Sequence, residues 1–107
     1  MPVVHVVSFK YKDSVSEEQR SQLWADLNAF RTQCLYSDGK PYILDFKGST
    51  ENISPEGRGQ GYHQLFISTF PSREHVKYYL EQDPVHRAFV EKVKPTLADA
   101  FIYDFEV

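Results

Sequence analysis

Few side chains in this sequence could do chemistry, and His86 holds the most informative position. Asp83-Pro84 is typical of the N-cap and first residue of a helix, where the missing proline N–H costs nothing. His86 then falls at the third position, inside the positive end of the helix dipole. That position and burial both favour a neutral imidazole able to accept a proton. The alternative is a histidine that packs and hydrogen-bonds beside the cap.

The other candidates are weaker on their own. His5 lies in an apolar strand segment, where it is either a pocket residue or a satisfied core histidine. The four histidines lack the paired spacing of metal ligands, so we predict no metal site, and nothing signals a cofactor. Cys34, the single cysteine, falls in an apolar helical stripe and is interpreted as a small core residue.

Four strands are needed to position these side chains. Runs of β-branched and aromatic residues predict strands over residues 3–11, 42–47, 62–70 and 100–107. Alternation along the first strand places His5, Val7 and Phe9 on one face and Val4 and Val6 on the other. Because both faces are largely apolar and helices cover one of them, we expect a partner subunit to cover the second.

Two helical regions separate the strands. Ser16-Glu17-Glu18-Gln19 is a capping box, and it precedes an apolar stripe made of Leu23, Leu27, Phe30 and Cys34. Ser72 caps a short helix over residues 73–81, and the helix from Pro84 follows it. The order β-α-β-β-α-β predicts an α+β, ferredoxin-like fold, with one four-stranded antiparallel sheet and the helices on one face.

Several segments together resemble the stress-responsive dimeric A/B barrel (Dabb) family. They are the first strand from Val4 to Asp13, the Gly61-Tyr62 pair, the segment from Tyr79 to Phe89 with its Asp-Pro-Val-His core, and the final Ile102-Tyr103-Asp104-Phe105. The elements occur in order over nearly the whole chain. The resemblance implies one Dabb domain over residues 1–107 and a homodimer in which two sheets close a dimeric α+β barrel with the helices outside.

The family includes a catalytic member, the plant olivetolic acid cyclase, which closes a ring by an aldol reaction. The resemblance implies catalytic roles for His5, Tyr79 and His86 if this chain is an enzyme, with Tyr78 as the alternative to Tyr79. Two pocket residues of the cyclase, a tyrosine and a histidine, fall on Leu27 and Gln64 here. Leucine removes a hydroxyl and glutamine cannot transfer protons at neutral pH, so any chemistry differs from that of the cyclase.

We predict that the three candidate catalytic residues converge on one cavity. Its ligand-binding wall should contain the residues that share the helix-facing side of the sheet or the inner stripes of the helices. These are Val7, Phe9, Leu23, Leu27, Gln64, Phe66 and Phe89. Much apolar wall with few polar groups is the usual composition of a small-molecule site.

Two functions follow. The first is a stress-responsive homodimer that binds a small hydrophobic, aromatic or polyketide ligand and has no established reaction. The alternative is a cofactor-independent cyclase or lyase that uses the His and Tyr side chains as acid and base.

The net charge of −3 and the absence of a basic run argue against nucleic acid as a partner. No apolar stretch is long enough for a membrane span, and nothing demands an oxidising compartment, so we expect a cytoplasmic protein.

Overall fold

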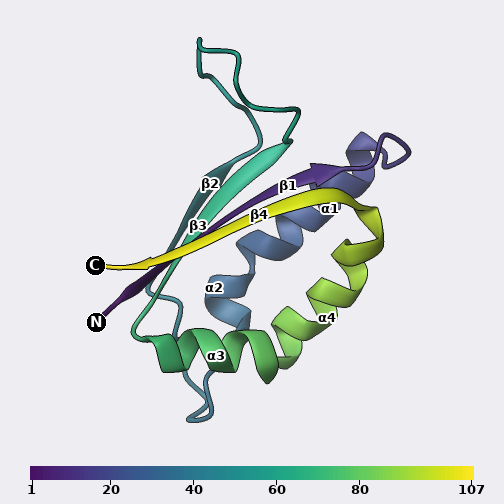
Figure 1. Ribbon diagram of the computed structural model, residues 1–107. Helices are drawn as coiled ribbons and strands as arrows, with labels where there is room; N and C mark the ends of the chain where they lie inside the picture. The colour runs from purple at the N-terminus through teal and green to yellow at the C-terminus, as the bar shows by residue number, and fades with distance from the viewer.

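The computed structural model describes all residues from 1 to 107 as one sheet backed by helices (Figure 1). Along the chain the elements are β1 (Val3–Tyr11), α1 (Glu17–Asn28), α2 (Phe30–Gln33), β2 (Asp45–Ser49), β3 (Gln64–Phe70), α3 (Arg73–Glu81), α4 (Pro84–Val93), a 3₁₀ turn (Lys94–Thr96) and β4 (Leu97–Glu106). None of the helices is long and apolar enough to cross a membrane.

The sheet is antiparallel throughout, with strand order β2-β3-β1-β4. The two long connections each carry helices, and Figure 1 shows all of these helices on the same side of the sheet. This is the ferredoxin-like arrangement that the order of elements predicts, so the predicted fold class is confirmed. In the central strand β1, His5 lies opposite Ser68 of β3 on one side and opposite Asp104 of β4 on the other.

The predicted helix starts are confirmed by their hydrogen bonds. The Ser16 hydroxyl accepts from the amide of Gln19, whose side chain accepts from the amide of Ser16, so the capping box is complete. Ser72 caps α3, and Asp83 caps α4 with Pro84 at its first position. Each helix therefore begins where local sequence chemistry satisfies its free N–H groups.

Three strands have boundaries different from those expected. The second strand is Asp45–Ser49, shifted toward the C-terminus from residues 42–47; the third begins at Gln64 instead of residue 62, and the last at Leu97 instead of residue 100. In the expected second strand, Tyr42 and Ile43 are apolar because they are buried in irregular chain. Composition alone cannot distinguish such buried irregular chain from a strand.

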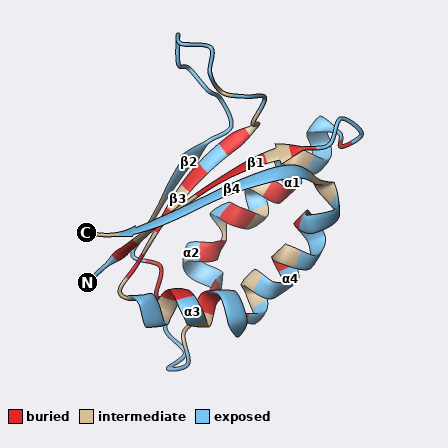
Figure 2. Ribbon diagram, in the orientation of Figure 1, coloured by how far each residue is buried: buried red, intermediate tan, exposed pale blue.

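Burial differs sharply between the two faces of the sheet. On the face toward the helices, Val7, Phe9 and Phe66 of the two central strands are less than a tenth exposed. The other face, called the open face below, carries large apolar side chains that are partly exposed, and Figure 2 shows most of β4 as exposed. Four of them are 43–59% exposed: Leu65, Phe101, Tyr103 and Phe105. Residues 50–63 connect β2 to β3 and extend beyond the end of the sheet (Figure 1).

Candidate functional site

A cavity of about 220 Å³ lies between the helix-facing side of the sheet and the helices. Its wall is apolar apart from two histidines and a lysine. The lining residues are His5, Val7, Phe9, Leu27, Phe66, Tyr79, Leu80, His86, Phe89, Val90, Val93, Lys94, Leu97, Ala100 and Ile102. The structure thus brings the three candidate catalytic residues and five of the seven predicted wall residues to one cavity.

Leu23 and Gln64 do not line this cavity. Leu23 is 3% exposed and lies about one turn before Leu27 on α1, so it packs in the core outside the cavity. Gln64 shares the helix-facing side but lies at the start of β3, opposite Phe9, where it borders other hollows. Placing a residue on the correct face of a sheet does not place it at the correct position along the strand.

His5 is held by a residue that the sequence reasoning assigned no role. Its Nδ1 lies 2.5 Å from Oδ1 of Asp104, which stands directly opposite on β4. The histidine side chain is 4% exposed, whereas the aspartate side chain is 37% exposed. A carboxylate hydrogen-bonded to Nδ1 fixes the orientation of the imidazole. The one sequence signal for this contact was the antiparallel pairing of the first and last strands, which can bring His5 and Asp104 to the same face of the sheet.

Tyr79 and His86 form a stacked pair beside His5. Their ring centroids are 3.8 Å apart and the His5 ring is 6.0 Å from that of Tyr79. Tyr79 is 1% exposed, and burial raises the pKa of its phenol well above the usual value. The alternative residue, Tyr78, instead donates a hydrogen bond to the Leu35 carbonyl outside the cavity. The geometry therefore selects Tyr79 over Tyr78 as the cavity residue.

His86 is a half-buried residue with a buried, unused ring nitrogen. Its Nδ1 has no hydrogen-bond partner in the chain. Burial lowers the pKa of His86 to about 4, although the Tyr79 backbone and the Asp83 carboxylate act in the opposite direction. A nearby His5 lowers it further. His86 is therefore neutral at pH 7, as its place near the helix start predicts, and can exchange a proton or a hydrogen bond with a ligand.

This shift makes the stability of the fold depend on pH. The folded-state pKa of about 4 lies below the ordinary value of 6.5, so the unfolded chain binds more protons between these values. The contribution of neutral His86 is complete above pH 6.5 and is lost as the pH falls toward 4. We expect on the order of 2–3 kcal/mol of unfolding free energy to depend on this residue. The free energy of unfolding in urea, measured from pH 7 to 4.5, should fall more steeply for the wild type than for His86→Gln. Parallel curves for the two proteins would contradict this prediction.

Asp83 anchors the start of the helix that carries His86. Its carboxylate is fully buried and accepts hydrogen bonds from the Tyr42 hydroxyl at 2.5 Å, from the Val85 amide at 2.9 Å and from the His86 amide at 3.2 Å. Burial and this carboxylate raise the pKa of the Cys34 thiol, which is also fully buried. The expectation that Cys34 is a core residue is confirmed. Through these contacts Asp83 fixes both the helix start and the position of His86.

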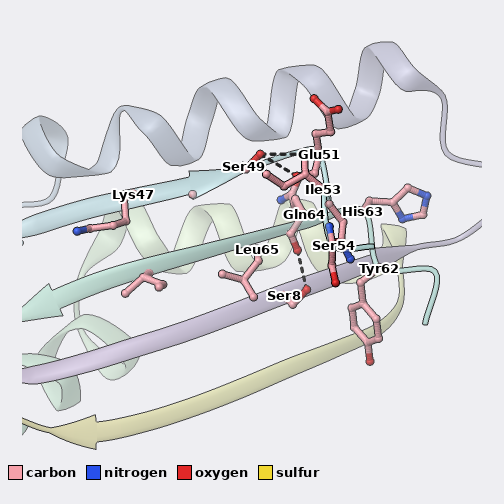
Figure 3. A pocket seen from close by; sticks show the side chains of 13 residues that line it. Ser8, Lys47, Ser49, Glu51, Ile53, Ser54, Tyr62, His63, Gln64 and Leu65 are labelled. Atoms are coloured by element: carbon pink, nitrogen blue, oxygen red, sulfur yellow. Dashed lines mark hydrogen bonds between the residues drawn. The ribbon is translucent and has the colours of Figure 1, made fainter. Parts of the chain in front are cut away.

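A larger hollow of about 670 Å³ lies on the opposite side of the sheet, under the extended connection (Figure 3). Ser8, Leu65 and Ile67 supply its floor on the open face, and residues of the connection, such as Ile53, supply its side. None of the three candidate catalytic residues reaches it. No group of three or more His, Cys, Asp or Glu side chains in the chain could hold a metal ion.

Comparison with known proteins agrees with this fold. The chain is 30% identical to the stress-response A/B barrel domain-containing protein HS1 of Arabidopsis thaliana, over 98% of this chain and 89% of that protein. Its structure resembles a hydroxynitrile lyase from Passiflora edulis with a TM-score of 0.81 at 22% identity, covering 99% of this chain and 93% of the other. It also resembles a dimeric ferredoxin-like protein of unknown function from Thermobifida fusca, with a TM-score of 0.78 at 20% identity over 100% and 92% of the chains.

At such low identity the two structural similarities support the fold alone. The family comparison is more direct, because residues 3–107 match the description "Stress responsive A/B Barrel Domain". That match covers every strand and helix described above and agrees with the resemblance carried by the first strand, the Asp83–His86 segment and the last strand. The chain belongs to the stress-responsive A/B barrel domain (Dabb) family.

Proposed function

We propose that this protein is a stress-responsive homodimer whose cavity beneath the sheet binds a small, mainly apolar molecule. The observation that carries the proposal is the convergence of His5, Tyr79 and His86 in a cavity that is otherwise almost wholly apolar. A site of this composition binds through its walls and orients the ligand through a few polar groups.

The homodimer is supported by the open face of the sheet. Leu65, Phe101, Tyr103 and Phe105 together with Ile67 form an apolar surface of a kind that monomeric proteins rarely expose. Three of the similar solved structures are described as dimeric with a ferredoxin-like fold. A second copy of the sheet is the occupant that fits both facts. The helices and the cavity then lie outside the interface.

Replacing His86 by alanine tests the binding function. We expect His86→Ala to weaken a bound small aromatic alcohol by about tenfold, because one buried hydrogen bond is worth about 1.4 kcal/mol. Binding is measured by NMR titration with benzyl alcohol. His75→Ala is the matched control, since His75 stacks on Tyr36 and bonds to Ser72 outside the cavity. Equal affinities for the wild type and His86→Ala, or no binding to either, would refute the proposal.

A second candidate function is acid–base catalysis on a carbonyl compound, as in a cyclase or lyase. It is favoured by the chemistry of the three polar residues. Neutral His86 can accept a proton from carbon, the Tyr79 phenol can donate to the developing oxyanion, and the Asp104 carboxylate can hold His5 in place. The structural similarity to a hydroxynitrile lyase is consistent with such chemistry.

Catalysis has its own test. Acetophenone in D₂O should exchange its methyl protons faster with the wild-type protein than with His86→Ala or Tyr79→Phe, as followed by NMR. Loss of exchange in both variants, with binding retained in Tyr79→Phe, would support catalysis. Exchange no faster than in buffer would leave the protein a binder without this reaction.

We also propose that residues 1–107 act as one domain in the cytoplasm. The single antiparallel sheet and the core shared by all its helices support one domain. A free, fully buried Cys34 is compatible with a reducing compartment.

A further inference from the structure

We propose that the cavity selects neutral molecules of about one ring that carry a hydroxyl or carbonyl oxygen, and that it rejects carboxylates. These molecules enter between β4 and the ends of α3 and α4. The inference rests on the proposed binding function and adds the class of ligand and its route. It is carried by the volume, charges and exposure of the lining residues.

The volume sets the size limit. An apolar protein cavity of about 150 Å³ holds benzene, whereas the cavity here measures about 220 Å³. The difference leaves room for a short polar substituent on one ring. The buried ring of Phe9 packs edge to face against Phe66 and stacks on Phe89. A second fused ring on the ligand would therefore have to displace packed aromatic side chains.

Charge limits the ligand further. His86 and Tyr79 are both neutral at pH 7, so neither can pair with an anion inside the cavity. Lys94 is the only ammonium on the wall, and it is exposed. The Asp104 carboxylate, close to His5, repels a second carboxylate. Burying a carboxylate without a cation costs several kcal/mol, so anions should remain in water.

One polar contact is available for a neutral oxygen. The His86 Nδ1 is buried and has no partner, which is costly unless a ligand supplies one. A hydroxyl can both donate and accept, so it suits either tautomer of the imidazole. The Tyr79 phenol, stacked on the same ring, gives a second polar group next to it.

The route of entry follows from exposure. Most of the wall is buried or half-buried, but Leu80 and Ile102 are 49% and 60% exposed, and Ala100 and Lys94 are exposed as well. Leu80 lies in the last turn of α3 and Lys94 follows α4, while Ala100 and Ile102 lie on β4. The mouth therefore lies between β4, the last turn of α3 and the C-terminal end of α4. Ile102 is on the helix-facing side, so a partner on the open face would leave the mouth free.

Three compounds test the selection in the full-length protein: benzyl alcohol, benzoate and 1-naphthalenemethanol. They share an aromatic ring and differ in charge or in size. We expect benzyl alcohol to perturb the NMR signals of the Leu80 and Ile102 methyl groups and to bind at least about tenfold more tightly than either of the others. Ile102→Trp should narrow the mouth and weaken benzyl alcohol by about tenfold, whereas Leu35→Trp, at an exposed site away from the cavity, should not.

The outcomes separate the inference from the binding function. Benzoate or the two-ring alcohol binding at the same methyl groups as tightly as benzyl alcohol would overturn the selection and leave the binding function intact. Unchanged affinity in Ile102→Trp would overturn the route. Failure of all three compounds to bind would overturn the binding function and this inference with it.

Discussion

Replacing Tyr103 by glutamate should convert the protein from a dimer to a monomer. Tyr103 is 59% exposed and lies on the open face between Phe101 and Phe105, opposite Val6 of β1. If a second sheet covers this face, each interface gains two buried carboxylates without cations, at a cost of several kcal/mol. We expect the dissociation constant to rise by more than about 100-fold. Light scattering at micromolar concentration should then give half the wild-type mass.

Leu35→Glu is the matched control for this change. Leu35 is 41% exposed, but it lies in the connection between α2 and β2 and not on the sheet. The same charge there should leave the mass unchanged. A wild-type protein that scatters as a monomer, or a Tyr103→Glu variant that remains a dimer with normal secondary structure, would contradict the proposed interface.

Local sequence signals predicted those features that local physics determines. The capping residues Ser16, Ser72 and Asp83 start their helices because a side-chain oxygen near free N–H groups works in any tertiary context. Alternation in β1 placed His5 on the helix side and Val6 on the open side. These two kinds of signal, with the order of the elements, were sufficient for the fold, whereas the grouping of His5, Tyr79 and His86 came from the resemblance to the family.

Features that depend on pairing between distant segments were not predictable in the same way. The polar segment Asp45–Ser49 is a strand because its backbone pairs with β3, while the more apolar Tyr42 packs in the core. The bond between His5 and Asp104 joins residues 99 positions apart and depends on the register of β1 with β4. The sequence alone therefore assigned no role to Asp104, although the structure places it against His5.

Asp83→Ala should cause a large loss of stability, about 3 kcal/mol or more. The substitution removes the cap of α4 and leaves the Tyr42 hydroxyl and the amides of Val85 and His86 without their acceptor in a fully buried place. Urea unfolding at pH 7 should show a lower midpoint with an unchanged slope.

Two milder variants show whether the loss comes from these hydrogen bonds. Asp83→Asn keeps an acceptor for the helix amides, and Tyr42→Phe removes only the hydroxyl, so each should cost about half as much as alanine. Because Asp83 fixes the helix start, the alanine variant should also move the NMR signals of the His86 ring, while Tyr42→Phe should move them less. Equal stability of Asp83→Ala and the wild type would mean that the buried carboxylate contributes no net stability, since the cost of desolvating it then offsets its three hydrogen bonds.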